Sequence, residues 1–94
     1  MEHNRTKLRL KYGVYGNGRT AIELSTLNGQ PYATATVNIP DALLHKDEVI
    51  IKTYSENEGI LEMLEQEGIV ERTGMSATSG MITAPICKLL KKTS

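Results

Sequence analysis

Apolar and polar residues alternate through most of the first half of the chain, which is the pattern of half-buried β-strands. The first such segment, residues 7–14, has two faces. The apolar face is formed by Leu8, Leu10, Tyr12 and Val14, and the basic face is formed by Lys7, Arg9 and Lys11. Alternation returns over residues 20–27 and over residues 33–39. Between these two segments lies Asn28-Gly29, which favours a type I′ turn, so the sequence predicts an antiparallel hairpin.

The second half combines short strands with one helix. A β-branched run at Val49, Ile50 and Ile51 predicts a strand that ends near Tyr54. A capping-box pattern over residues 55–58, apolar residues at helical spacing and a glycine at position 68 predict an amphipathic helix over about residues 56–67.

After this helix, extended structure is expected to resume at residues 69–71, and residues 73–80 are expected to form a loop or an irregular hairpin. A last strand is expected over residues 81–89. Because proline lacks an N–H group, Pro85 fits that strand only at an edge or a bulge.

Together these elements predict an α+β fold, in which an antiparallel sheet of five to six short strands carries the helix on one face. Ninety-four residues are enough for one domain, 1–94, with residues 1–5 and 91–94 expected to be frayed. The chain is too short for a doubly wound sheet or a (β/α)₈ barrel. It has neither a secretory signal pattern nor an apolar run of about 18 residues, so a cytoplasmic location without membrane contact is expected.

Charge is balanced overall but strongly segregated along the chain. Eleven basic and eleven acidic residues give a net charge of zero. Residues 41–71, however, hold nine acidic and two basic residues, whereas residues 1–19 hold five basic residues and one acidic residue. A segregated chain of this kind can present two surfaces of opposite sign.

The predicted helix is acidic, and it contains no Lys or Arg to offset its glutamates. At helical spacing Glu58, Glu62 and Glu65 share one ridge, opposite the apolar residues. We interpret this ridge as a docking face for a protein partner with a basic surface, one that normally binds nucleic acid. The alternative is a solvated helix face that keeps a small protein soluble.

The basic N-terminal segment supports a second hypothesis. Arg5, Lys7, Arg9 and Lys11 could follow a nucleic-acid backbone, which would make the protein a small nucleic-acid-binding module. The ordinary alternative is an edge strand that its charges protect from pairing with other chains. A third interpretation is a homodimer that pairs through an exposed sheet edge or face.

No residue pattern indicates catalysis. Two histidines and one cysteine form no zinc-binding spacing, and neither Ser76 nor Ser79 has the context of a nucleophile. We therefore expect no enzyme activity, no catalytic residues, no metal and no cofactor. Cys87 lies in an apolar stretch and is expected to be a buried, reduced thiol.

Several runs of this sequence resemble a small bacterial family of unknown function. The similar runs are residues 18–24 (GRTAIEL), 29–40 (GQPYATATVNIP), 51–59 (IKTYSENEG) and 68–70 (GIV). The resemblance covers about residues 12–90 and includes no catalytic signature, so it assigns no site residues. Family members are compact proteins carried largely by plasmids, conjugative elements and phages. The resemblance therefore implies a protein of a mobile element, and small proteins of this kind often inhibit a host defence complex such as a CRISPR effector.

Overall fold

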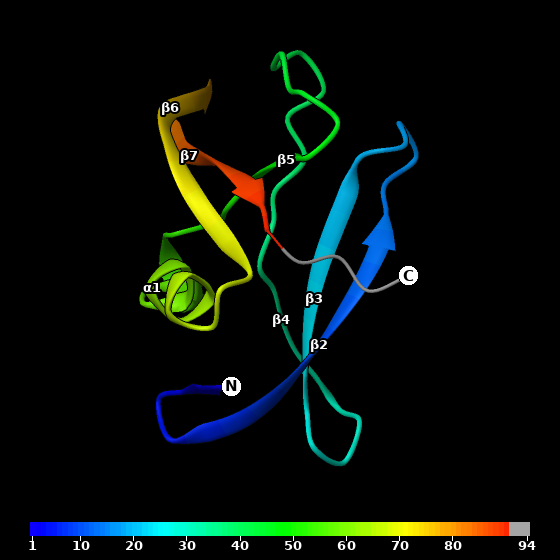
Figure 1. Ribbon diagram of the computed structural model, residues 1–94, viewed down its shortest axis with the longest axis vertical. Helices are drawn as coiled ribbons and strands as arrows, with labels where there is room; N and C mark the ends of the chain where they lie inside the picture. Colours follow the sequence, from blue (N-terminus) through cyan, green and yellow to red (C-terminus); the bar gives the residue numbers. More distant parts are fainter. Residues whose placement is uncertain (91–94) are drawn as a thin grey trace.

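The alternating segments of the first half form a four-stranded antiparallel sheet in the order β1-β2-β3-β4 (Figure 1). The computed structural model describes residues 1–90 of the chain, so the predicted fraying of residues 91–94 lies outside the described residues. The strands of this sheet are β1 (Glu2–His3), β2 (Thr6–Val14), β3 (Thr20–Thr26) and β4 (Pro31–Thr34). The predicted hairpin between β3 and β4 is therefore confirmed.

The turn of that hairpin differs from the predicted type I′ form. Gly29 has a φ of 88°, but Asn28 is not among the residues with positive φ, as a type I′ turn would require. A hydrogen bond of 3.0 Å from the Gly29 N–H to the Thr26 carbonyl closes the turn. A left-handed glycine after such a turn is typical of a three-residue hairpin loop.

The N-terminal residues are ordered, which corrects the expectation that residues 1–5 are frayed. β1 pairs with the start of β2, and the two-residue connection Asn4-Arg5 has φ values of 49° and 67°. The side chain of His3 is buried and 5% exposed. Its contacts are with residues far along the chain, so periodicity within the N-terminal segment could not reveal them.

The second sheet has three strands in the order β5-β7-β6, namely β5 (Glu48–Ile50), β6 (Val70–Ser79) and β7 (Ile82–Leu89). Residues 73–79, which were expected to lie in a loop or an irregular hairpin, belong to β6, and β6 forms an irregular hairpin with β7 that has a register shift between Arg72 and Ser76. Gly80, with a φ of 60°, begins the two-residue connection to β7. Pro85 lies in the central strand, beside this irregularity and just beyond the last residue that β5 pairs.

The α-helix begins later than the sequence predicts. Residues Ser55–Asn57 form a 3₁₀ turn, and α1 spans only Ile60–Gln66. Gly59 separates the two segments because its φ of 89° is left-handed. The predicted capping box is not formed, since no side chain makes a capping hydrogen bond at either start. None of the helices within residues 1–90 is long and apolar enough to cross a membrane.

One extended segment connects the two sheets. β4 ends at Thr34, earlier than the predicted strand over 33–39, and the chain then passes from one sheet to the other. The Ala35 N–H donates to the Ile22 carbonyl of β3 at 2.8 Å, and the Val37 N–H donates to the Ile50 carbonyl of β5 at 3.0 Å. The sheets are thereby joined through backbone hydrogen bonds as well as through the core.

The core has two parts. The larger one packs β2, β3, β5, β7 and α1 together, and its fully buried side chains include Ile22, Ile51, Ile60 and Leu64. The smaller one lies between the β6–β7 hairpin and the residues that follow β4, and consists of Ile39, Ile50, Ala77, Ala84 and Ile86. The α+β class with antiparallel sheets and one α-helix is confirmed. The predicted single sheet of five to six strands is wrong, since seven strands form two sheets.

Candidate functional site

The three glutamates of the predicted acidic ridge do not all lie on the helix. Glu62 and Glu65 belong to α1, which lies between β1 and the start of β6 (Figure 1). Glu58 precedes Gly59 and belongs to the connection between the 3₁₀ turn and α1. The predicted single helical ridge is therefore wrong for Glu58, because the left-handed Gly59 interrupts the helix.

A basic residue from another element pairs with both glutamates of α1. Arg72 of β6 donates to Glu65 Oε2 at 3.0 Å and to Glu62 Oε2 at 2.9 Å. The hydrogen bond to Glu65, followed by the two negative charges, raises the pKa of Arg72. The helix is therefore less acidic than its own sequence indicates. Arg72 lies outside the helix in the sequence but beside it in the structure, where it offsets part of the negative charge.

These carboxylates remain available to a partner. The side chains of Glu62 and Glu65 are 67% and 33% exposed, and Arg72 contacts one oxygen of each. Two carboxylates held by one guanidinium carry a net charge of −1 and have defined positions. An arrangement of this kind can accept a Lys or Arg side chain from another protein without first having to order two long glutamate side chains.

Glu58 takes part in a different contact through its backbone. Its carbonyl accepts a hydrogen bond of 2.6 Å from Nε2 of His3, while its side chain is exposed. Nδ1 of the same ring forms a hydrogen bond of 2.7 Å with the Tyr32 hydroxyl, which also donates to the His3 carbonyl at 3.4 Å. His3 therefore connects β1, β4 and the residue before α1, which is a structural role.

The basic residues of β2 keep the predicted alternation. Lys7, Arg9 and Lys11 are exposed, whereas Leu8 is buried. Arg5 does not extend this face, since it lies in the turn between β1 and β2 with a positive φ. The structure therefore places three of the four predicted basic residues on one face of one strand.

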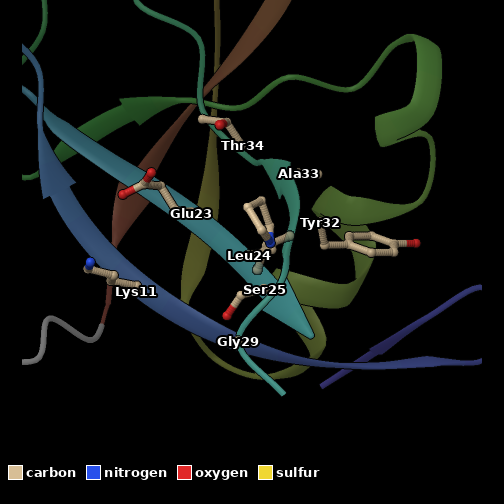
Figure 2. Close-up of a pocket in the computed structure, with 9 residues that line it drawn as sticks. Lys11, Glu23, Leu24, Ser25, Gly29, Tyr32, Ala33 and Thr34 are labelled. Atoms are coloured by element: carbon tan, nitrogen blue, oxygen red, sulfur yellow. The ribbon is translucent and has the colours of Figure 1, made fainter. Parts of the chain in front are cut away.

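A shallow pocket of about 330 Å³ adjoins the end of this basic face (Figure 2). Lys11 and Glu23, which are cross-strand neighbours in β2 and β3, lie on one side of it. Tyr32 also lines the pocket, but its ring points away from them, toward α1. The pocket lies on the sheet surface, and its charged groups, Lys11 and Glu23, are exposed.

A second hollow region lies at the other end of the molecule. Leu43 and Met75 are 93% and 66% exposed, and both line two adjoining hollows of about 220 and 360 Å³. Ile86 lies beneath both hollows and Ile39 beneath the larger one. No local sequence pattern indicates this region, because it joins a loop after β4 to a strand more than 30 residues later.

Cys87 is the buried, reduced thiol that the sequence predicts. Burial, with a smaller contribution from the charge of Glu65, raises the pKa of this thiol to about 11. Within residues 1–90, no group of three His, Cys, Asp or Glu side chains could hold a metal ion.

Cys87 should therefore react with iodoacetamide only when the protein opens. At pH 8 we expect alkylation of the native protein to be at least about 100-fold slower than in urea, because both burial and the raised pKa suppress the thiolate. Mass spectrometry of the time course measures the rate, and equal rates in both states would contradict the prediction.

The raised pKa of Cys87 also makes stability depend on pH. Since only the unfolded chain releases the thiol proton at moderate pH, the contribution of Cys87 to stability should be lost as the pH rises from about 8.5 to about 11.

No protein-family model, curated protein or solved structure compared with this chain matches it. The surfaces of the molecule are therefore the basis for inferring its function.

Proposed function

We propose that this chain is a non-enzymatic protein-binding module of a mobile genetic element, which docks on a basic surface of a host defence complex such as a CRISPR effector. The docking surface is acidic and consists of Glu58, Glu62 and Glu65. The main support is the cluster that Glu62 and Glu65 form with Arg72, in which one guanidinium holds an exposed and a partly exposed carboxylate in place. Nucleic-acid-binding proteins present Lys and Arg at their binding surfaces, which are the groups such a cluster attracts.

The proposal is tested by reversing these three charges. The Glu58→Lys, Glu62→Lys, Glu65→Lys variant should lose at least about tenfold in affinity for a partner isolated from host lysate after nuclease treatment, because it then repels a basic surface. A matched control reverses three acidic residues elsewhere, Glu2, Glu23 and Asp47, and should lose much less. Affinity is measured by surface plasmon resonance with the purified partner, after circular dichroism has verified the fold. Equal losses in the two variants would show that only total charge matters and would refute the docking surface.

The exposed basic face of β2 supports a second candidate function, direct binding of nucleic acid through Lys7, Arg9 and Lys11, with Arg5 in the adjacent turn. This hypothesis predicts binding of a single-stranded oligonucleotide that weakens steeply as salt rises, because bound counterions are released from the phosphates. Fluorescence anisotropy at low salt measures it. Binding that is absent there, or unchanged when Lys7, Arg9 and Lys11 are replaced by Gln, would refute this function.

A further inference from the structure

The outer edge of β6 carries backbone groups that are free to pair. In the order β5-β7-β6, β6 has one neighbour within residues 1–90. Ser76 lies opposite Pro85, whose carbonyl accepts from the Ile51 N–H on the other side, so Ser76 and Pro85 are not a hydrogen-bonded pair. Hydrogen-bonded pairs alternate along an antiparallel ladder, so Thr78 is not hydrogen-bonded to β7 either. The N–H and C=O groups of Ser76 and Thr78 therefore point outward, away from β7.

Side-chain geometry supports this assignment. Thr78 lies opposite Thr83, and their hydroxyl oxygens are 3.3 Å apart. Side chains approach most closely in the non-hydrogen-bonded pairs of an antiparallel ladder. The short distance between the Thr78 and Thr83 hydroxyls therefore indicates a non-hydrogen-bonded pair, in which the backbone groups of Thr78 face the open edge.

A groove runs beside this edge. The hollow of about 360 Å³ lies between residues 75–78 of β6 and residues 39–43, the start of the loop that precedes β5. Its walls are the exposed side chains of Leu43 and Met75, and its floor includes the buried Ile39 and Ile86. Asp41, which is exposed, is the one charged residue that lines it within the described part of the chain.

The loop wall of the groove is held in position. Arg19 donates from Nη1 to the Ile39 carbonyl at 2.7 Å and from Nη2 to the Ala42 carbonyl. A planar guanidinium that contacts two carbonyls of one turn restricts how that turn can move. The groove therefore exists before any ligand binds, which lowers the entropic cost of binding.

We propose that this groove binds an extended segment of a partner protein, which adds to the sheet as a new strand beside β6. The backbone of the segment pairs with Ser76 and Thr78, an apolar side chain enters between Leu43 and Met75, and a Lys or Arg side chain meets Asp41. Addition of a strand to an exposed edge is an established mode of peptide recognition, in which backbone bonds give affinity and side-chain pockets give specificity. The inference uses none of the three glutamates of the acidic surface and does not depend on them.

A second copy of this chain is the competing occupant, and the charges argue against it. Residues 73–79 of β6, which would meet the groove in an edge-to-edge dimer, contain no Lys or Arg. Such a dimer would therefore bring no cation from residues 73–79 to Asp41, and Arg72, farther along β6, is already paired with Glu62 and Glu65. A basic segment of another protein satisfies Asp41 as well as the backbone groups.

The test titrates the ¹⁵N-labelled full chain with two synthetic heptapeptides, KTVTLTK and ETVTLTE, and records amide shifts by NMR. Binding of the basic peptide should shift the amides of Ser76, Thr78 and residues 39–43. The acidic peptide should bind about tenfold more weakly, because it faces Asp41. Shifts elsewhere, no shifts at millimolar peptide, or equal affinity for both peptides would overturn the proposal. Concentration-dependent shifts at Ser76 and Thr78 without peptide would also overturn it, in favour of a dimer.

Two variants separate the groove from the fold. Thr78→Pro removes an outward N–H without removing a bond to β7, and Leu43→Ser removes an apolar wall at a position that is 93% exposed. Each should abolish the shifts caused by KTVTLTK. Val14→Ser, which changes a side chain of β2 that is 75% exposed, is the matched control and should bind normally. If Leu43→Ser, whose exposed side chain contributes little to folding, still binds like the control, the proposal is wrong.

Discussion

Asn57→Asp should destabilise the protein by about 3–5 kcal/mol at pH 7, because it places an uncompensated charge in the interior. Asn57 is fully buried, and its Nδ2 donates to the Thr34 carbonyl at 2.7 Å. Its Oδ1 is also buried and has no hydrogen-bond partner within the described residues. A carboxylate at this position would lose the one hydrogen bond that the amide makes and would find no donor for either oxygen.

The effect of Asn57→Asp should depend on pH in a defined direction. Burial raises the pKa of the new carboxyl above the value of about 3.9 in the unfolded chain. The variant is therefore least stable, relative to the native sequence, above its folded pKa and recovers as the pH falls and the protonated carboxyl can donate to Thr34. Urea unfolding at pH 4 and pH 7 measures the difference. Asn28→Asp, in an exposed turn, is the matched control and should change stability little at either pH; a loss equal to that of Asn57→Asp would contradict the argument.

His3→Ala should be the second most damaging change described here, with a loss of about 2–4 kcal/mol. It removes a buried ring, leaves the Glu58 carbonyl without its donor, and leaves the Tyr32 hydroxyl with only the backbone carbonyl of residue 3 at 3.4 Å. Because β1 has only two residues, we expect it to detach from β2 in this variant. Hydrogen exchange at Leu8, whose N–H donates to the Met1 carbonyl at 2.7 Å, should then accelerate.

Tyr32→Phe separates the hydrogen bonds of His3 from its packing. This change removes the hydroxyl but keeps the aromatic ring, which meets the His3 ring edge to face at a centroid distance of 5.8 Å. A loss of about 1 kcal/mol is expected. If His3→Ala costs no more than Tyr32→Phe in urea unfolding, the ring of His3 does not anchor the N-terminal strand.

The sequence reveals those parts of the fold in which residues close along the chain determine the structure. Alternation predicted the buried and exposed faces of β2 and the hairpin of β3 with β4, since both features depend on neighbouring residues. Val14 is an instructive exception, because it shares the apolar parity of Leu8 but is 75% exposed at the end of its strand. The alternation identifies the face of the strand on which a side chain lies. How deeply that side chain is buried depends on which other elements pack against that face.

Contacts between distant residues account for most of the differences. His3 meets Glu58, and Arg72 meets Glu62 and Glu65 across two elements, so neither contact follows from a local pattern. The capping-box pattern was misleading for a different reason. Gly59 has access to the left-handed conformation, and the chain uses it to restart the helix after the 3₁₀ turn.

The same distinction between local patterns and distant contacts applies to the candidate surfaces. The exposure of Lys7, Arg9 and Lys11 follows from the alternation of one strand, and the sequence predicted it. The groove beside β6 requires residues 39–43 of the loop before β5 to lie beside a strand that includes Met75, and it also requires the outward direction of two backbone groups. Such a site becomes visible only when strand order and register are known.

The order of strands in the second sheet has a consequence for synthesis of the chain. β7 is the central strand and follows both of its neighbours in the sequence, so β5 and β6 have no partner in this sheet until residues 82–89 have been made. A nascent chain on the ribosome can form the β2–β3–β4 meander early, but the apolar residues of β5 must wait for almost 40 further residues to be added. During that interval β6 and the edge of β5 that faces β7 are unpaired and can aggregate, and chaperones have an opportunity to bind them.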